Sequence, residues 1–241
     1  MNKTCIVTGG SSGIGRAIVE VFMEHGYHVI NLDIQPRSIG EFIRCDITDH
    51  QAVRQTIEKI ASKHDVDALI CSAGIHFSAN IENTSEQDLM RVFNINVKGA
   101  YSAIQAVLPN MKQNKNGAIV LVSSDQAVIA KRNSFAYNLS KSALASMAKT
   151  TALDYAEFNI RANAVCPGTI ETPLYHKAID NYCDKTGANK QAIHDDEAHQ
   201  QPLGRLGQPE EVAQLVYFLA SEQASFITGS LQLIDGGYTA Q

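Results

Sequence analysis

The chain has 241 residues, 44% of them hydrophobic and 19% charged, and its formal net charge is −5. This length and composition suit one globular domain with a single large core, and the mildly acidic balance excludes the basic surface that holds nucleic acid. The opening apolar run is too short for a signal peptide, and no later run reaches membrane-spanning length. We therefore expect a cytoplasmic protein with one domain over residues 1–241 and with neither nucleic acid nor membrane as a partner.

Short apolar or β-branched runs alternate with longer helical patterns along the chain. Strands are expected at 4–9, 28–33, 67–74, 117–124, 161–168 and 231–237, and helices at 14–25, 50–63, 85–113, 136–157 and 209–220. Strands that are apolar on both faces and separated by helices are typical of a parallel sheet covered on both sides. The pattern predicts an α/β fold, a doubly wound Rossmann-type parallel sheet of about seven strands. Residues 173–205 lack clear periodicity, and we expect a substrate lid there.

The stretch TGGSSGIG, residues 8–15, follows the first expected strand and opens the first expected helix. Glycine lets the backbone turn sharply and approach a pyrophosphate, whose charge then meets free N–H groups at the helix start. Gly9, Gly13 and Gly15 have the spacing G-x-x-x-G-x-G, which differs from the commoner fingerprint G-x-G-x-x-G. The stretch predicts a dinucleotide site, and an ordinary strand-to-helix turn is the alternative.

An acidic residue ends the second expected strand. Asp33 lies eighteen positions beyond Gly15, close to the offset at which a carboxylate accepts hydrogen bonds from both ribose hydroxyls of NAD. Its charge would repel the 2′-phosphate of NADP, and Ser11 and Ser12 stand where a basic residue could have bound that phosphate. The sequence therefore favours NAD, with a solvated strand-end carboxylate as the alternative interpretation of Asp33.

The cysteines and histidines predict no metal site. The five cysteines are odd in number and widely spaced, and Cys5, Cys45, Cys71 and Cys166 lie in or beside apolar stretches. Buried, reduced thiols are the expected state of such residues. The eight histidines show no spacing typical of metal ligands.

A tyrosine and a lysine stand four positions apart in SFAYNLSKSAL, residues 134–144. Residues with this spacing share one face of a helix. About 0.4 such pairs are expected by chance in this chain, so Tyr137 and Lys141 alone prove little. A tyrosine that moves a proton near neutrality needs its pKa lowered by about 3 units, or about 4 kcal/mol, and a neighbouring ammonium can supply roughly that amount.

An ordered series of motifs resembles the short-chain dehydrogenase/reductase family, in particular its single-domain NAD-dependent members. The series is TGGSSGIG at 8–15, CDI at 45–47, CSAG at 71–74, NVKG at 96–99, VSS at 122–124, YNLSK at 137–141 and CPGTIETP at 166–173. The resemblance covers nearly the whole chain. Cys71 and Ser72 depart from the pattern, because many members have Asn-Asn-Ala-Gly at CSAG.

The resemblance implies a catalytic group of Asn96, Ser124, Tyr137 and Lys141. In the family the tyrosine moves the proton, the lysine tunes it, the serine binds the substrate oxygen, and the asparagine anchors a water that links the lysine to solvent. Without the family, Asn96 is only a helix asparagine, and Ser124 only a turn residue after a strand.

The loop, the strand-end acid and the resemblance together give the expected cofactor contacts. These are Gly9, Ser11, Ser12, Gly13, Ile14, Gly15, Asp33, Asp46, Ile47, Ala73, Gly74, Tyr137, Lys141, Pro167, Gly168, Ile170 and Thr172. The cofactor is expected to be NAD, with Asp46 against the adenine and with Thr172 and the backbone near Ile170 on the nicotinamide carboxamide. The resemblance also implies a homotetramer built through the helices around 99–112 and 136–157.

Asp125 and Gln126 follow Ser124 directly, so we expect them at the pocket wall, where they favour a small hydroxylated substrate such as a sugar, polyol or hydroxy acid. The expected activity is hydride transfer between NAD and a secondary alcohol or ketone. Two alternatives are a reductase of 3-oxoacyl thioesters on acyl carrier protein and a non-catalytic NAD-binding regulator. Net charge −3 over residues 171–200 disfavours the acidic carrier. Lys131 and Arg132 are the counter-evidence, because at the pocket entrance they would attract an anion such as a sugar acid or a carrier's phosphopantetheine.

Overall fold

The structure, a computed structural model, describes residues 3–240. Within them, seven strands form one parallel sheet in the order β3-β2-β1-β4-β5-β6-β7. The strands are β1 (Thr4–Thr8), β2 (His28–Asp33), β3 (Glu41–Arg44), β4 (Val66–Cys71), β5 (Gly117–Val122), β6 (Ile160–Pro167) and β7 (Leu231–Ile234). The central strands β1 and β5 are buried along their whole length, as expected for a sheet covered on both faces.

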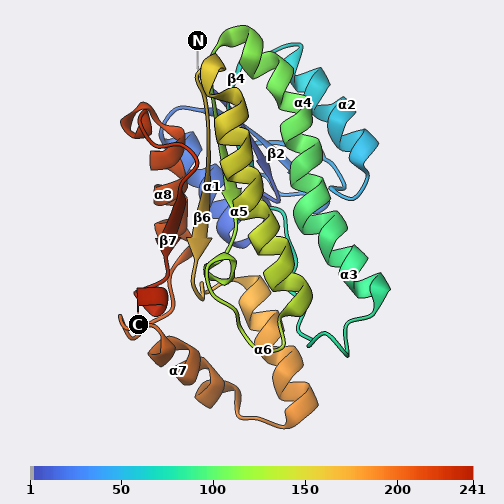
Figure 1. Cartoon of the computed structure of the whole chain (residues 1–241), viewed down its shortest axis with the longest axis vertical. Coiled ribbons are helices and arrows are strands. Elements are labelled where there is room, and N and C mark those ends of the chain that lie inside the picture. Colours follow the sequence, from blue (N-terminus) through green and yellow to red (C-terminus); the bar gives the residue numbers. More distant parts are fainter. Residues whose placement is uncertain (1–2, 241) are drawn as a thin grey trace.

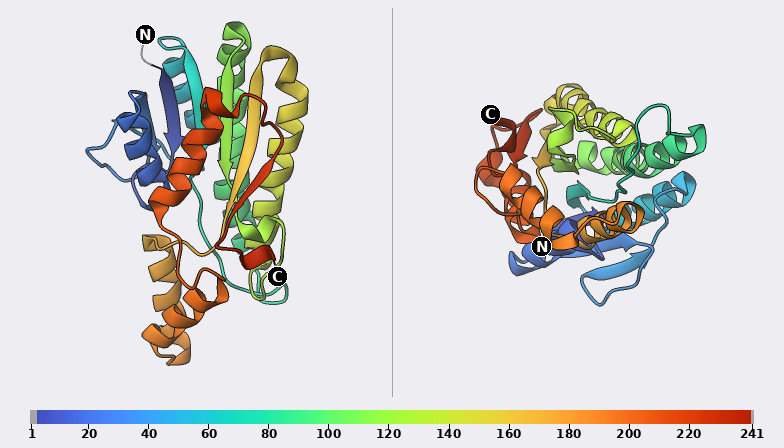
Figure 2. Two further views of the ribbon diagram at one scale, coloured as in Figure 1. Left: turned by 90° about the vertical axis from the view of Figure 1, so that its left-hand side faces the viewer. Right: turned by 90° about the horizontal axis from the view of Figure 1, so that it is seen from below.

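Helices cover both faces of the sheet (Figure 2). They are α1 (Gly13–Glu24), α2 (His50–Ala61), α3 (Glu86–Phe93), α4 (Gly99–Asn114), α5 (Phe135–Tyr155), α6 (Pro173–Thr186), α7 (Lys190–Gln200) and α8 (Pro209–Ala220). One core lies between the sheet and α1 with α8, and a second lies between the sheet and α2, α4 and α5. This is the doubly wound α/β fold that the alternation of strands and helices predicts.

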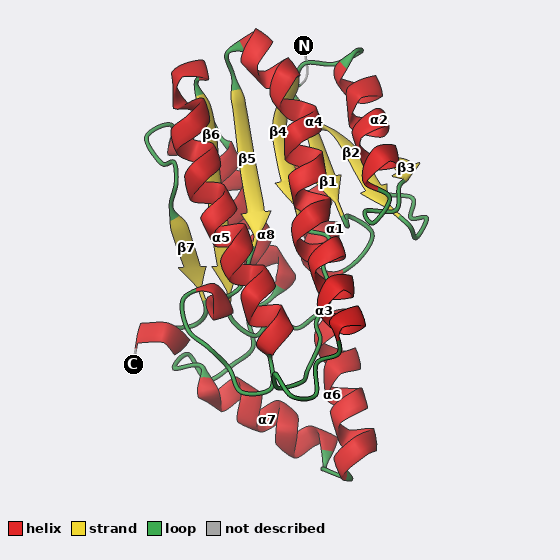
Figure 3. Cartoon of the chain, turned by 45° about the vertical axis from the view of Figure 1, so that its right-hand side comes forward, coloured by secondary structure: helices red, strands yellow, loops and turns green. Residues whose placement is uncertain are grey.

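The direction in which successive strands are added to the sheet reverses at β1. The chain passes from β1 outward to β2 and β3, and then crosses back to β4 on the other side of β1. In open α/β sheets, ligands bind outside the carboxyl ends of the strands at such a switch point. The strand arrows in Figure 3 point toward the end of the molecule that carries α6 and α7, so the carboxyl ends of the strands and the switch point face that end.

The structure differs from the expected elements in three places. β3 is an additional strand of four residues that pairs only with β2 at the sheet edge, and its sequence EFIR is too short and too polar to stand out. The helix expected over 85–113 is two helices joined by one π-helical turn, Asn94–Lys98. Residues 173–205, which lack clear periodicity, contain α6 and α7; α7 has no buried residue, which explains the weak pattern.

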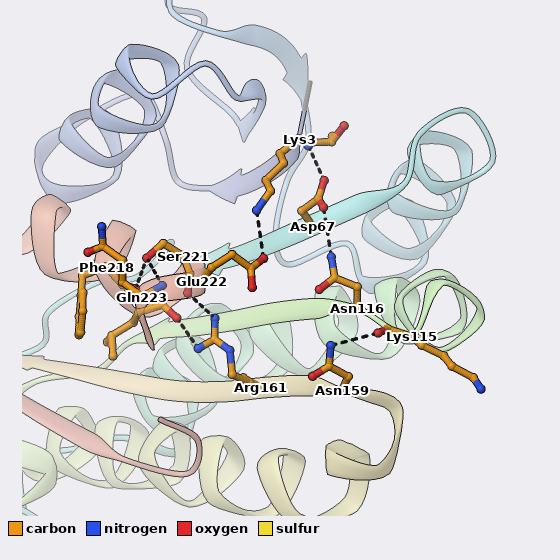
Figure 4. Close-up of polar contacts among 12 residues, drawn as sticks. Lys3, Asp67, Lys115, Asn116, Asn159, Arg161, Phe218, Ser221, Glu222 and Gln223 are labelled. Carbon is orange, nitrogen blue, oxygen red and sulfur yellow. Dashed lines mark hydrogen bonds and ion pairs between the residues drawn. The ribbon is translucent and has the colours of Figure 1, made fainter. Parts of the chain in front are cut away.

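A polar network closes the opposite end of the sheet, at the amino ends of the strands (Figure 4). The guanidinium of Arg161 donates hydrogen bonds to three carbonyl oxygens, at 2.6 Å to Leu219, 3.0 Å to Ser221 and 3.3 Å to Ile227. Asp67 accepts hydrogen bonds from the backbone N–H of Thr4 and from the side chain of Asn116. The carbonyl oxygens of Leu219 and Ser221 lie at the end of α8, where carbonyls have no hydrogen-bond donor within the helix. Arg161 supplies these oxygens with a donor.

Candidate active site

The loop between β1 and α1 depends on its glycines. Gly9 and Gly13 have φ of +72° and +50°, a region that only glycine adopts readily. A Cβ on Gly15 would lie 2.1 Å from the carbonyl oxygen of Gly9, and one on Gly9 would lie 2.7 Å from the Cα of Ala73. Ser12 precedes α1 in an extended conformation, and its side chain makes no capping hydrogen bond. The loop therefore brings its backbone and the free N–H groups of α1 to the switch point between β1 and β4.

Asp33 faces this loop from the end of β2. Its carboxylate accepts one hydrogen bond from the backbone N–H of Ser11 at 3.0 Å and another from the N–H of Gln35 at 3.0 Å. The Ser11 hydroxyl donates to the carbonyl oxygen of Gln35 at 2.7 Å. A carboxylate has about four acceptor positions, so Asp33 can hold the loop and still accept hydrogen bonds from a ribose.

The residues of the CDI and CSAG motifs lie along the same edge. Asp46 accepts hydrogen bonds from the backbone N–H and the hydroxyl of Thr48, which lower the pKa of its exposed carboxyl. Ile47 packs against Gly99, where a Cβ would lie 2.4 Å from the Ile47 side chain. The departures from the family pattern leave the strand intact, because Cys71 pairs with Thr8 and the N–H of Ser72 donates to the Thr8 carbonyl oxygen.

Tyr137 and Lys141 lie on α5 and face the end of β5. The Lys141 Nζ atom lies 5.4 Å from the centre of the Tyr137 ring and donates a hydrogen bond to the carbonyl oxygen of Val122 at 2.9 Å. Burial lowers the pKa of Lys141 to about 8. The backbone oxygen of Lys141 also accepts a hydrogen bond from the Ser123 hydroxyl at 2.8 Å, which ties α5 to the end of the strand.

The pKa of Tyr137 differs from the expectation. Burial raises it; a hydrogen bond with Ser124 lowers it, and the charge of Asp125 raises it further. Burial outweighs the lowering expected from Lys141, whose ammonium donates to the Val122 carbonyl oxygen and lies 5.4 Å from the ring centre. The structure therefore places the proton on the phenol near neutrality.

Asn96 lies in the π-helical turn and is buried. Its Oδ1 accepts a hydrogen bond from the backbone N–H of Ile75 at 2.8 Å, and its Nδ2 donates to the Ile75 carbonyl oxygen and to the Ser140 hydroxyl, both at 3.0 Å. Ser140 in turn donates to the backbone oxygen of Tyr137 at 2.8 Å. A Cβ on Gly74 would come 3.3 Å from Asn96 Oδ1 and 3.7 Å from Lys141 Nζ. Asn96 therefore joins the CSAG loop to the helix that carries Tyr137.

Asp125 and Gln126 do not form the open polar wall that their position suggests. The side chain of Asp125 is 2% exposed, and its Oδ1 accepts a hydrogen bond from the Ser124 hydroxyl at 2.7 Å. Its Oδ2 and the Gln126 Oε1 are buried and make no hydrogen bond. The turn Asp125–Ala127 after Ser124 directs both side chains inward, so a substrate hydroxyl does not reach these oxygens in this conformation.

The CPGTIETP segment brings the start of α6 to the glycine loop. Thr172 is buried and caps α6, its hydroxyl accepting a hydrogen bond from the N–H of Tyr175 at 3.2 Å. A Cβ on Gly13 would lie 3.4 Å from Thr172, so the two segments are in contact. Ile170 pairs with Gly207 in a β-bridge, and Pro167 ends β6. Gly168 approaches Asp235, whose Cα would lie 2.9 Å from an added Cβ.

The structure thus brings most of the expected site residues to one edge of the sheet, and it adds two that the motifs do not contain. His76 packs edge-on against Tyr137 with ring centres 4.8 Å apart, and burial lowers the pKa of its imidazole. Lys131 lies 3.6 Å from Asp125. Neither falls in a motif of fixed spacing. The sequence indicates Lys131 only as a group that would attract an anion, and its contact with Asp125, like that of His76 with Tyr137, follows from the three-dimensional structure.

Within residues 3–240, no group of three or more histidine, cysteine or acidic side chains is arranged to hold a metal ion. Cys5, Cys45, Cys71 and Cys166 are buried and unpaired, as expected, and Cys183 is partly buried. In this part of the chain, no helix has the length and apolar character needed to cross a membrane.

Comparison with known proteins finds similar oxidoreductases that match nearly the whole chain. A family model described as "Enoyl-(Acyl carrier protein) reductase" matches residues 9–239. The chain is 36% identical to 3-oxoacyl-(acyl-carrier-protein) reductase FabG of Thermotoga maritima, covering 98% of this chain and 97% of that protein. It is 34% identical to 2-keto-3-deoxy-L-fuconate dehydrogenase of Xanthomonas campestris, covering 98% and 80%.

Solved structures agree. Aldohexose dehydrogenase of Thermoplasma acidophilum superposes with a TM-score of 0.94 at 39% identity, over 100% of this chain and 95% of that one. The protein ElxO with NADP bound superposes with a TM-score of 0.91 at 32% identity, over all of both chains. The fold, the matched family model and these relatives place the chain in the short-chain dehydrogenase/reductase family of oxidoreductases.

Proposed function

We propose that the protein is an NAD-dependent dehydrogenase that passes a hydride between the nicotinamide and a secondary alcohol or ketone of a small hydroxylated substrate. The observation that carries this proposal is the convergence of Ser124, Tyr137 and Lys141 at the carboxyl end of β5. The NAD ring, when bound, supplies C4 as the hydride acceptor or donor. This chain supplies a proton donor and acceptor, a hydroxyl beside it and a buried cation.

In alcohol oxidation, the substrate hydroxyl gives its proton to Tyr137 as its carbon gives up a hydride. In ketone reduction, Tyr137 returns that proton to the carbonyl oxygen. When the Ser124 hydroxyl turns its hydrogen from Asp125 to the same oxygen, that bond limits the movement of the oxygen. Lys141, whose pKa of about 8 leaves it charged at neutral pH, stabilises the tyrosinate that oxidation requires.

The preference for NAD rests on Asp33. Its carboxylate faces the glycine loop, bonded to the N–H of Ser11, where a 2′-phosphate would meet a negative charge. Arg37, exposed in the following loop, is the cation nearest in sequence that could offset this charge. Because ElxO, a structural neighbour, binds NADP, the cofactor is best tested by measuring kcat/KM with both nucleotides.

The preference for a hydroxylated substrate draws on the relatives and on charge. Relatives named for aldohexose and for 2-keto-3-deoxy-L-fuconate act on sugars or sugar acids. Residues 171–200, which include α6 and α7, carry six acids and three bases, net charge −3, and would repel an acidic carrier protein. Reduction of 3-oxoacyl thioesters is the second candidate, because FabG is among the relatives.

One screen tests these proposals. Reduction of NAD is followed with sugars, polyols, hydroxy acids, aliphatic alcohols and sterols, and oxidation of NADH with acetoacetyl thioesters. We expect the highest kcat/KM with a sugar, polyol or hydroxy acid; a thioester or sterol with kcat/KM well above all of these would contradict the substrate class.

The Tyr137→Phe variant should bind NADH normally and lose about 10²-fold or more of kcat, because only the proton donor is removed. Turnover close to wild type would contradict the mechanism.

A further inference from the structure

A buried carboxylate bonds the serine of the proposed catalytic group. The Ser124 hydroxyl donates to Asp125 Oδ1 at 2.7 Å and accepts a hydrogen bond from the backbone N–H of Gln126 at 3.2 Å. A hydroxyl has one hydrogen to donate. While Asp125 holds that hydrogen, Ser124 presents only acceptor positions to the substrate oxygen and to Tyr137.

The carboxylate is in turn held by a cation. Lys131 Nζ lies 3.6 Å from Asp125 Oδ2, an oxygen that is buried and makes no hydrogen bond. The same ammonium lies 4.6 Å from the ring centre of Tyr238, a distance at which a cation is attracted to an aromatic ring. A buried carboxylate is costly unless it is paired, so Lys131 explains how Asp125 remains beside the serine.

The aromatic ring is part of a C-terminal turn that is itself fixed. Asp235 accepts hydrogen bonds from the backbone N–H and the hydroxyl of Thr239, at 2.9 and 2.6 Å, and from the N–H of Gly237 at 3.0 Å. Tyr238 stands between these two residues. These bonds therefore hold the ring that Lys131 contacts, and they connect residues 235–239 to the proposed catalytic group.

We propose that Asp125, paired with Lys131, is a positioning residue that fixes the direction of the Ser124 hydrogen bond and through it the proton affinity of Tyr137. The inference rests on the proposed function. Four groups act on Tyr137 or on its surroundings: Ser124 and Asp125 after β5, Lys141 on α5, and His76 on the loop after β4. The carboxylate favours the protonated phenol, and Lys131 offsets the carboxylate.

Single and double variants separate this role from a purely structural one. Alcohol oxidation needs deprotonated Tyr137, so its kcat/KM falls as pH drops through the pKa of that residue. Asp125→Asn removes the negative charge and should move this acidic limb to lower pH by roughly 0.5 unit or more. Lys131→Met leaves the carboxylate uncompensated and should move it to higher pH. The Asp125→Asn/Lys131→Met double variant should return toward wild type.

Arg132→Met is the matched control, because it removes one exposed positive charge next to Lys131. It should leave unchanged the pH at which kcat/KM falls on the acidic side. Each variant is also titrated with NAD but without substrate, using tyrosinate absorbance corrected with Tyr137→Phe. This second measurement does not depend on turnover. Thermal unfolding shows which variants are folded. If Lys131→Met does not fold, the effect of losing Lys131 is measured instead as the rise in the pH midpoint of the double variant above that of Asp125→Asn.

Opposite shifts of the two single variants, with an unmoved control, support the proposal. Midpoints indistinguishable from wild type, or shifts in the same direction, overturn it. A failure of the proposed function has a different signature, since wild type would then reduce neither NAD nor NADP with any substrate, or Tyr137→Phe would keep its turnover. In that case the absorbance titration still reports whether Asp125 acts on Tyr137.

Discussion

At the scale of single residues, the cofactor preference depends on Asp33. Its carboxylate accepts hydrogen bonds from the backbone N–H groups of Ser11 and Gln35. The side chain therefore fixes the shape of the loop and also places a negative charge beside it. Replacement by alanine would remove both functions at once. Replacement by asparagine keeps an acceptor oxygen and removes the charge, and the two variants together distinguish loop geometry from repulsion.

We expect Asp33→Ala to weaken NAD binding by roughly 10-fold or more, because charge-assisted hydrogen bonds to the ribose are lost. Asp33→Asn should narrow the ratio of kcat/KM for NAD over NADP, since the repulsion of the 2′-phosphate disappears. Glu24→Ala, at an exposed acid near the end of α1, should leave this ratio unchanged. A wild-type enzyme that already prefers NADP would refute the preference for NAD.

The candidate site was predictable from the sequence to the extent that its residues have fixed spacing. Gly9, Gly13 and Gly15 are required by one loop geometry, and Tyr137 and Lys141 by one helix face. His76 and Lys131 belong to loops: the contact of His76 with Tyr137 depends on how two distant segments fold together, and that of Lys131 with Asp125 on the path of the loop after β5. The inward direction of Asp125 was unpredictable for the same reason, because it depends on the turn that follows Ser124.

At the scale of elements, strong hydrophobic periodicity predicted the strands of the sheet centre and the helices that cover them. The edge strand β3 and the helices α6 and α7 bury too little apolar surface to show such a pattern. The π-helical turn is invisible for another reason. A π-helical turn contains the same residue types as an α-helix, so the sequence does not distinguish the two. Here the wider turn places Asn96 against the CSAG loop.

Arg161 provides a prediction at this scale, because it joins β6 to the end of α8 far from the site. Arg161→Met should lower the free energy of unfolding by roughly 2–3 kcal/mol, since three carbonyl oxygens lose a charged donor. Arg161→Lys should recover part of this loss, because one ammonium cannot reach all three. Urea unfolding measures both, and kcat below the unfolding midpoint should stay unchanged. A fall in kcat without loss of stability would contradict a structural role.

At the scale of the whole molecule, apolar side chains remain uncovered on α4 and α5. Tyr101 is 51% exposed and Leu153 is 82% exposed, and these two helices lie side by side on one face of the sheet (Figure 1). Large exposed apolar side chains on neighbouring helices are typical of a contact surface. The edge strand β7 also leaves Leu233 44% exposed. The surface of one chain therefore has two regions that association would cover.

We expect the protein to form a homotetramer through α4 and α5, with light scattering at micromolar concentration giving four times the chain mass. Leu153→Asp should reduce that mass, because a charge buried at an interface without a partner opposes association. Met23→Asp is the matched control, since Met23 is 46% exposed on α1, on the other face of the sheet; it should leave the mass unchanged. A monomer in the wild type would refute the tetramer, and equal effects of the two variants would exclude α5 as the contact.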